Sequence, residues 1–320
     1  MSMLAPRSTV TLGPAISWEE TACPLCGRDD ASPLAEATDP IPAEGVGLRF
    51  AIVRCRHCAL AYTNPRPSPG TIGSFYPPGY SPHEAKSADR GNARPSRFWS
   101  RIAGHPCLER RGVLPIKPPG RLLDFGCGGG SYLTRMAALG WRVTGLDFSA
   151  DAVRTVREKL GHTAYLGTLP HPELPPGSFE VVTMWQVVEH LHQPVEVLRE
   201  AFKLLVPGGC LVVAVPNFES QTRSWFGEHW FGLDLPRHLT HFTPKSLQAT
   251  LQSAGFEVSS LRGLTHAGWI RASARRTRAA GAAGSGTKLL CWRPLARVAA
   301  WAGYALGGAE CIVAVAKRPA

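Results

Sequence analysis

The sequence predicts an α/β fold, in which a doubly wound sheet forms the main domain and a small cysteine-bearing domain precedes it. Strand and helix patterns alternate over residues 121–262, as in such a sheet. A glycine-rich turn, 126–130, follows the first of these strands, and two Cys-x-x-Cys pairs stand near the N-terminus. With 320 residues, of which 44% are hydrophobic, the chain has room for one main domain and an appendage.

The two Cys-x-x-Cys pairs indicate a zinc site. Two such knuckles can supply four thiolates to one tetrahedral zinc, and the metal would be structural because no position stays open for water. An apolar, β-rich run over 48–53 separates the pairs and suits a ribbon hairpin. His57 is poorly placed to replace a cysteine, and a set of unrelated reduced cysteines is the alternative. The expected ligands are Cys23, Cys26, Cys55 and Cys58.

The charge balance points to anionic partners. The formal net charge is +11 and the pI is near 9.5. A nucleic acid, a phosphorylated substrate or an acidic membrane face would fit this charge, and so would an alkaline surface with no partner. Residues 1–20 contain no basic segment followed by an apolar core, so we expect no signal peptide and a cytoplasmic protein.

Residues 64–119 have the composition of a linker with short helices. They are rich in Pro, Gly, Ser and Arg, with aromatic residues such as Phe75 and Tyr76 among them. We expect most of these aromatic side chains to pack the linker against the neighbouring domain, although some could line a substrate pocket.

Capping residues and hydrophobic periodicity delimit the elements of the main domain. Gly140 and Gly161 stand where helices end, and Ser149 and Thr243 stand where helices begin. The expected strands are 122–125, 141–146, 163–166, 179–184, 210–215 and 256–261.

The C-terminal part is less regular. Four arginines over 271–278, followed by a Gly/Ala/Ser run, predict a mobile basic loop. Arg and Pro residues interrupt the apolar stretch 289–306, so we expect an interfacial helix or a lid over the substrate site rather than a membrane-spanning helix. Residues 311–316 predict a strand that could close the sheet.

The glycine turn is suited to a nucleotide-like ligand, and the acids around it favour a cationic one. Asp147 ends the second strand, where a carboxylate can accept both ribose hydroxyls of an adenosine. The turn lacks the third glycine of the dinucleotide fingerprint, and Asp124 in front of it would repel a pyrophosphate. S-adenosylmethionine carries a sulfonium and an ammonium, so the electrostatics favour this cofactor.

Several motifs together resemble those of the class I S-adenosylmethionine-dependent methyltransferases. They are Leu-Leu-Asp-Phe-Gly-Cys-Gly-Gly-Gly, Val-Thr-Gly-Leu-Asp, Val-Glu-His and Leu-Val-Pro-Gly-Gly, spread over 120–262. Together with the cysteine pairs, Asn-Pro-Arg-Pro at 64–67 and Arg-His-Leu-Thr-His-Phe-Thr-Pro at 237–244, they resemble bacterial methyltransferases with an N-terminal zinc ribbon. The relatives of those enzymes include sugar C-methyltransferases and enzymes encoded among polysaccharide and natural-product genes.

The resemblance implies a seven-stranded Rossmann-like sheet whose last strand, 311–316, is antiparallel. It implies S-adenosylmethionine as cofactor and structural Zn²⁺ as metal. In most relatives an acid after the third strand lies near the adenine amine, but residues 167–169 offer none. The implied cofactor contacts are Asp124, Gly126 and Gly128 at the methionine end, Asp147 and Phe148 at the ribose and adenine, and Gln186 near the sulfonium.

Methyl transfer to a weak nucleophile needs a base, and histidines stand in an aromatic stretch after the fifth strand. His241, and after it His238, is the expected general base, while the alternative is that they only hydrogen-bond the lid. His190 is expected to start a helix or to cover the cofactor. The tryptophans and phenylalanines of the same stretch could clamp a sugar or an isoprenoid.

These observations predict a methyltransferase acting on a small molecule, such as a sugar, a nucleotide-linked sugar or a lipid-linked intermediate. An RNA methyltransferase and a non-catalytic cofactor-binding protein are the alternatives, but the chain lacks the Asn/Asp-Pro-Pro-Tyr element that holds a flipped base. The substrate is expected to be anionic or lipid-linked, with peripheral contact to the inner membrane face. The expected parts are a zinc ribbon (1–63), the linker (64–119), the methyltransferase core (120–262 with 305–320) and the substrate-side segments 217–243 and 263–304.

Overall fold

The computed structural model of the chain describes residues 16–40, 48–76, 119–282 and 284–320. Most of the predicted linker therefore lies outside the described residues. A seven-stranded sheet in the order β12-β13-β10-β9-β6-β7-β8 forms the frame of the molecule. Its strands are β6 (Arg121–Phe125), β7 (Arg142–Asp147), β8 (Thr163–Leu166), β9 (Phe179–Trp185), β10 (Leu205–Pro216), β12 (Glu257–Leu264) and β13 (Cys311–Lys317).

The sheet is parallel except at its last strand. β6, β7, β8, β9 and β10 run parallel to their neighbours, whereas β13 pairs antiparallel with both β10 and β12. The antiparallel seventh strand predicted at 311–316 is thus confirmed. In a sheet of this kind the carboxyl ends of the parallel strands share one edge, where such proteins bind their ligands.

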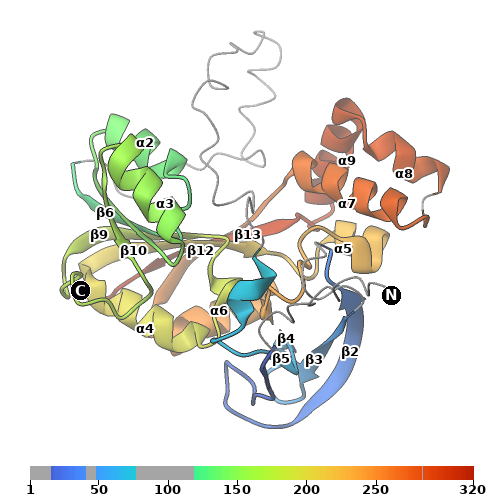
Figure 1. Ribbon diagram of the computed structural model, residues 1–320, viewed down its shortest axis with the longest axis horizontal. Helices are drawn as coiled ribbons and strands as arrows, with labels where there is room; N and C mark the ends of the chain where they lie inside the picture. The colour runs from blue at the N-terminus through green and yellow to red at the C-terminus, as the bar shows by residue number, and fades with distance from the viewer. Residues whose placement is uncertain (1–15, 41–47, 77–118, 283) are drawn as a thin grey trace, which may run out of the picture.

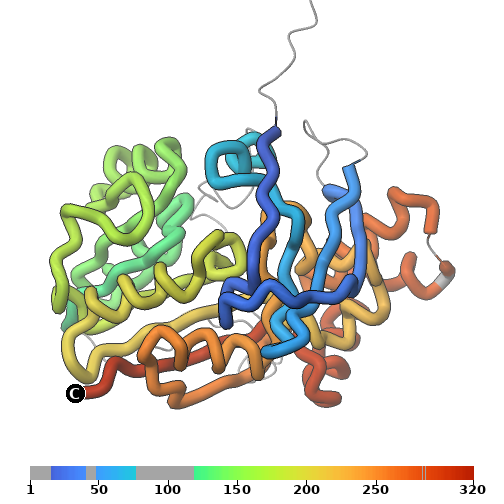
Figure 2. The backbone as a smooth tube through the Cα atoms, turned by 90° about the horizontal axis from the view of Figure 1, so that it is seen from below, coloured from blue at the N-terminus to red at the C-terminus, as the bar shows by residue number. Residues whose placement is uncertain are grey.

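Helices cover the two faces of the sheet. α2 (Ser131–Ala138) and α3 (Ala150–Arg154), which continues as the π-helical turn η3 (Thr155–Lys159), lie on one face, and α4 (Pro194–Leu204) and α6 (Pro244–Ser253) lie on the other (Figures 1 and 2).

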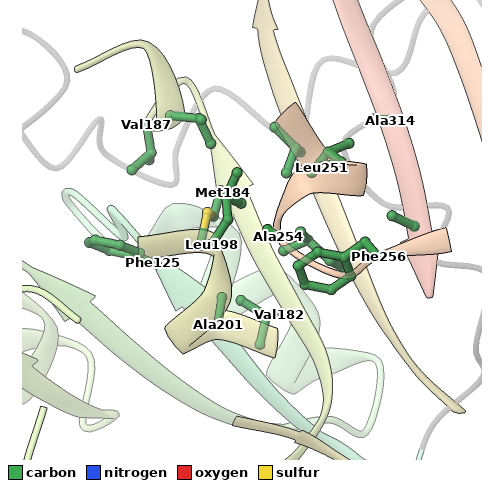
Figure 3. Close-up of a cluster of buried hydrophobic side chains, with 14 of the residues drawn as sticks. Phe125, Val182, Met184, Val187, Leu198, Ala201, Leu251, Ala254, Phe256 and Ala314 are labelled. Carbon is green, nitrogen blue, oxygen red and sulfur yellow. The ribbon is translucent and has the colours of Figure 1, made fainter. Parts of the chain in front are cut away.

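Successive strand residues alternate between the two faces. Leu122 and Val181 pack with the side chains of α2, whereas Leu123 and Val182 belong to the larger core under α4 and α6. Figure 3 shows part of that larger core, where Met184 of β9 lies between strand and helix side chains.

The capping signals in the sequence are confirmed. The Ser149 side chain accepts a hydrogen bond from the Ala152 amide, and Thr243 forms a reciprocal capping box with Ser246. β10 differs from the expected strand because it begins already at Leu205, and its register with β9 shifts between Leu205 and Cys210. The shift accommodates the Pro-Gly-Gly sequence, in which Gly208 has a positive φ.

The N-terminal region forms a separate four-stranded antiparallel sheet in the order β11-β4-β3-β2. The hairpin expected around the run 48–53 is present, since β2 (Ala31–Thr38) pairs with β3 (Arg49–Cys55). β4 (Ala61–Thr63) continues the sheet, and β11 (Thr240–His241), from the stretch that carries the histidines, completes it. Next to it lie β1 (Trp18–Glu19), which pairs with β5 (Arg66–Pro67), and the 3₁₀ turn η1 (Ile72–Phe75).

Three C-terminal helices form a lobe beside the sheet (Figure 1). The arginines expected in a mobile loop lie instead on α7, because Ile270, Ala274 and Thr277 repeat at helical spacing and are buried. No helix in the described ranges is both long enough and apolar enough to cross a membrane. The helices of the lobe are α7 (Ala267–Ala279), α8 (Ser285–Leu290) and α9 (Arg293–Ala305).

Candidate active site

The glycine turn after β6 is packed so tightly that side chains do not fit. Gly126 has a φ of +76°, and a Cβ there would collide with Val187 Cγ2. Gly130 has a φ of +74°, and its Cβ would lie 2.6 Å from Leu160 Cδ1. Both positions therefore require glycine. The turn is a cradle of backbone without side chains at these two positions, between the end of β9 and the helix after β7.

Asp124 and Asp147 flank this cradle, and both are buried. Thr183 donates a hydrogen bond to Asp124 Oδ1 over 2.6 Å. The Gly128 amide donates to Asp147 Oδ2 over 2.8 Å, and the Ser149 amide donates to Asp147 Oδ1 over 2.9 Å. Since each carboxylate oxygen has two acceptor sites, Asp147 can fix the turn and still accept from a ribose. The residues present therefore fit an adenosyl cofactor with a cationic end.

Aromatic side chains lie beside Asp147. The exposed Phe148 ring has its centroid 5.3 Å from that of Tyr76, in an edge-on arrangement. The Tyr76 hydroxyl lies 3.0 Å from His190 Nδ1, and burial raises the pKa of Tyr76 well above its usual value, so the phenol stays neutral. Tyr76 thus connects the end of β7 with the end of β9.

Gln186 directly follows β9 and has a positive φ of 58°. Its backbone amide donates to Ala214 O over 2.8 Å, and its side-chain Nε2 donates to Cys311 Sγ over 3.2 Å. Leu169, after the third parallel strand, is buried in the larger core. The contacts predicted for Gln186, Asp147 and Phe148 with the cofactor stay predictions, and so do those for Asp124, Gly126 and Gly128.

A methyltransferase-domain family model matches residues 98–261, which is half of the chain. The chain belongs to the class I S-adenosylmethionine-dependent methyltransferases. The expected fold, cofactor class and enzymatic activity are thereby confirmed, and the alternative of a non-catalytic cofactor-binding protein is set aside.

The methyltransferase also resembles individual curated proteins. It is 30% identical over 208 residues to a ubiquinone biosynthesis O-methyltransferase of Xanthomonas campestris pv. campestris. The alignment covers 57% of this chain and 84% of the Xanthomonas protein. It is 34% identical over 149 residues to a probable S-adenosylmethionine-dependent methyltransferase of Mycolicibacterium smegmatis, covering 45% and 55%. A crystal structure of an S-adenosylmethionine-dependent methyltransferase from Mesorhizobium loti aligns with a TM-score of 0.46 and 18% identity, covering 64% and 94%.

The two histidines predicted as general bases have different surroundings in the methyltransferase. Thr63 donates its hydroxyl proton to His238 O over 2.9 Å, so the 3.1 Å contact between Thr63 Oγ1 and His241 Nε2 has the histidine as donor. His241 also lies against Phe218, with ring centroids 5.1 Å apart. Its Nε2 thus ties β11 to β4.

His238 keeps an acceptor nitrogen. Its Nδ1 lies 2.9 Å from Gly232 O, and because a carbonyl can only accept, Nδ1 carries the proton and Nε2 the lone pair. His190 Nδ1 lies 3.0 Å from Arg237 O, which fixes the same tautomer. Burial lowers the pKa of His238 to about 4 and that of His190 to about 3, so both rings are neutral near pH 7. Their centroids are 4.7 Å apart.

Glu189 completes this cluster and was not predicted as a site residue. One ligand atom from each of Glu189, His190 and His238 lies within 4.8 Å of the others. The Glu189 side chain is fully buried, and burial raises its pKa to about 8. The Glu189-His190 pair is visible in the sequence. That His238 lies next to it in space depends on long-range contacts, which no local sequence pattern predicts.

The four predicted zinc ligands come together at one end of the N-terminal sheet. Cys23 Sγ lies 3.4 Å from Cys58 Sγ, Cys26 Sγ lies 3.6 Å from Cys55 Sγ, and all four atoms lie within 4.8 Å of one another. Zn–S bonds of about 2.3 Å in a tetrahedron require sulfur separations of about 3.8 Å. The cluster therefore fits a zinc ion.

Proposed function

We propose that this methyltransferase methylates a hydroxyl oxygen of a small molecule, and that His238 accepts the hydroxyl proton. The acceptor would be a sugar, a nucleotide-linked sugar or a lipid-linked intermediate. The observation that carries the proposal is the neutral pair of His238 and His190, which Tyr76 connects to Phe148 next to Asp147. The names of the Xanthomonas relatives, which specify O-methyl transfer, support oxygen as the acceptor atom.

The mechanism divides the work between cofactor and protein. Bound S-adenosylmethionine supplies an electrophilic methyl group, and Asp124, Gly126, Gly128, Asp147, Phe148 and Gln186 would hold it. Methyl transfer needs an acceptor oxygen aligned for in-line attack. His238 Nε2 takes the proton as the new oxygen–carbon bond forms, because the Gly232 carbonyl holds the proton already present on Nδ1. The Gly232 carbonyl orients the imidazole of His238, and the Arg237 carbonyl orients that of His190.

A cavity of about 260 Å³ opens beyond the end of β10 and supports an anionic acceptor. Two arginines, Arg54 and Arg223, and one acidic residue, Glu219, line it together with Phe218, so its charged lining is positive on balance. The Arg223 guanidinium lies 3.7 Å from the centroid of the Phe218 ring, which itself stacks near His241. A phosphate or carboxylate of the acceptor would pair with these arginines.

The His238 assignment predicts a selective loss of turnover. His238→Gln keeps the shape of the side chain but removes the basic nitrogen, so we expect kcat to fall by about 10²–10⁴. The measurement is transfer of an isotope-labelled methyl group into a small-molecule extract, followed by mass spectrometry. Binding of S-adenosylhomocysteine, measured by calorimetry, should stay unchanged.

His241→Gln is the matched control. We expect it to lower stability through the lost Thr63 hydrogen bond while the turnover of folded protein stays near the wild-type level. The opposite pattern, with turnover lost in His241→Gln and kept in His238→Gln, would assign the base to His241 instead. Turnover kept in both variants would contradict base catalysis by either histidine.

We propose that the four cysteines hold one structural Zn²⁺. The sulfur separations support tetrahedral coordination. Four thiolates would fill all four coordination positions of the zinc, so none is left for water. Elemental analysis should give one zinc per chain, falling strongly in Cys58→Ser but not in Cys291→Ser, a cysteine remote from the cluster in sequence. A chelator should lower the melting temperature of the wild type, and a zinc content near zero in freshly purified protein would refute the site.

A further inference from the structure

The lobe of α7, α8 and α9 has an unusual charge. Between Glu257 and Glu310 the sequence contains no acidic residue. The lobe itself, 267–306, carries seven basic residues, which account for +7 of the formal net charge of +11. They are Arg271, Arg275, Arg276, Arg278, Lys288, Arg293 and Arg297.

The outer face of the same lobe is apolar. On α9, Ala296, Ala300 and Gly303 are buried against the rest of the lobe, while Val298 and Trp301 lie on the opposite side of the helix and are 63% and 53% exposed. Around them, three further large side chains are 59–75% exposed: Leu289, Trp292 and Leu306. α9 is therefore apolar on both sides, although only one side packs on protein.

We propose that this face, named here the α9 face, docks on an anionic membrane surface. α9, at 1.5 Å per residue, would be about 20 Å long and would lie in the plane of the interface. Leu289, Val298 and Leu306 would enter the acyl boundary, and Trp292 and Trp301 would sit at the headgroup level that tryptophan prefers. The exposed arginines of α9, Arg293 and Arg297, would pair with lipid phosphates.

Charge and chemistry favour a membrane over other occupants. A second copy of the chain would place +7 against +7, which repels. An RNA would satisfy the arginines but would leave the aliphatic side chains in water, because phosphates and riboses offer them no apolar contact. An anionic bilayer offers phosphates to the arginines and acyl chains to the aliphatic side chains. The two contributions are needed together, because neither a short apolar surface nor a basic patch alone gives stable membrane binding.

The position of the lobe links the membrane to the acceptor side of the enzyme. α7 packs on the segment 217–243, where the Phe231 amide donates to Ser273 Oγ over 2.9 Å and the Phe231 ring lies 5.4 Å from that of Trp269. The same segment carries His238. Docking would thus hold the acceptor-binding side of the enzyme near the bilayer. Among the acceptors of the proposed function, on which this step rests, a lipid-linked intermediate fits this position.

The test is sedimentation of the full-length protein with vesicles, measured without cofactor or acceptor. We expect binding to vesicles of equal parts phosphatidylcholine and phosphatidylglycerol and little binding to phosphatidylcholine alone. Arg293→Glu with Arg297→Glu removes two attractive charges and adds two repulsive ones, so binding should fall at least about tenfold. Trp301→Ser with Leu306→Ser should also lose binding.

Matched variants on the far side of the sheet serve as controls. Leu139→Ser removes a side chain of similar exposure, and Arg142→Glu with Lys159→Glu reverses the same number of exposed charges. Both should bind vesicles like the wild type, and so should His238→Gln, which separates this proposal from the catalytic one. Circular dichroism should show all variants folded.

Three outcomes would overturn the proposal, and the first two concern vesicles. One is equal wild-type binding to anionic and neutral vesicles, and the other is unchanged binding of both α9-face variants. Retention of a poly(U) RNA that depends on Arg293 and Arg297, with no vesicle binding, would also overturn it and would favour a nucleic-acid partner.

Discussion

Glu189 places a carboxyl group in the interior where, among the described residues, neither of its oxygens has a hydrogen-bond partner. Burial, and after it the negative charge of Asp234, raises the pKa of Glu189 from the ordinary value of 4.5 to about 8. The folded protein therefore binds a proton between these pH values that the unfolded chain releases. This contribution to stability is fully present below pH 4.5 and is lost as the pH rises through 8.

Glu189→Gln should remove this alkaline loss. The variant cannot ionise, so we expect its melting temperature to match or exceed that of the wild type above pH 8 and to gain little near pH 4.5. Thermal unfolding across this range, with the exposed Glu196→Gln as control, measures the effect. Parallel pH profiles for wild type and Glu189→Gln would show that Glu189 is already ionised in the folded state.

The buried histidines act in the opposite direction. Burial lowers the pKa of His190, His238 and His241 from 6.5 to about 3 or 4, so the unfolded chain binds protons that the folded protein does not. The stability of the wild type and of Glu189→Gln should therefore fall as the pH drops below 6.5. The glutamate and the histidines together confine the wild type to a neutral optimum.

At the level of elements, the strands and helices of the methyltransferase core were predictable from the sequence because local signals coincide there. Gly126 and Gly130 mark a turn that tolerates no side chain, and Ser149 and Thr243 cap helices with their own hydroxyls. Periodicity, capping and turn chemistry all depend on residues within one or two helical turns of one another.

The elements that the sequence did not reveal depend on distant partners. β11 is only two residues long and exists because Thr240 and His241 pair with β4, which lies far away in the chain. The arginines of α7 suggested a loop because most of the buried positions of this helix are small residues, such as Ser273 and Ala274, which give a weak periodic signal. The site cluster was missed in part for the same reason, since His238 lies near Glu189 through long-range contacts such as the 2.7 Å hydrogen bond from the Leu239 amide to Glu189 O.

At the scale of the whole molecule, one side chain joins the N-terminal sheet to the methyltransferase. Arg237 is fully buried and donates to the carboxylate of Asp39, which follows β2, with a shortest distance of 2.6 Å. It also donates to Phe75 O over 2.8 Å and to Asp234 Oδ2 over 3.0 Å. Although burial alone would raise it, Arg237 holds the pKa of Asp234 below its usual range. Arg237 directly precedes His238, so the clasp also positions the proposed base.

Arg237→Met should therefore cost far more than the loss of an ordinary ion pair. It leaves Asp39 and Asp234 buried without their main partner, which costs about 3–5 kcal/mol in comparable cases. Arg56→Met is the control, because the Arg56–Asp30 pair is exposed on both sides and should contribute at most about 1 kcal/mol. Adding Asp39→Asn to Arg237→Met should recover part of the loss, since one of the stranded charges is then absent. Urea unfolding measures each difference. If Arg237→Met lowers the free energy of unfolding no more than Arg56→Met does, the clasp is contradicted. If it lowers the free energy of unfolding by the larger amount and turnover falls as well, the cysteine-bearing sheet helps to hold His238 in place.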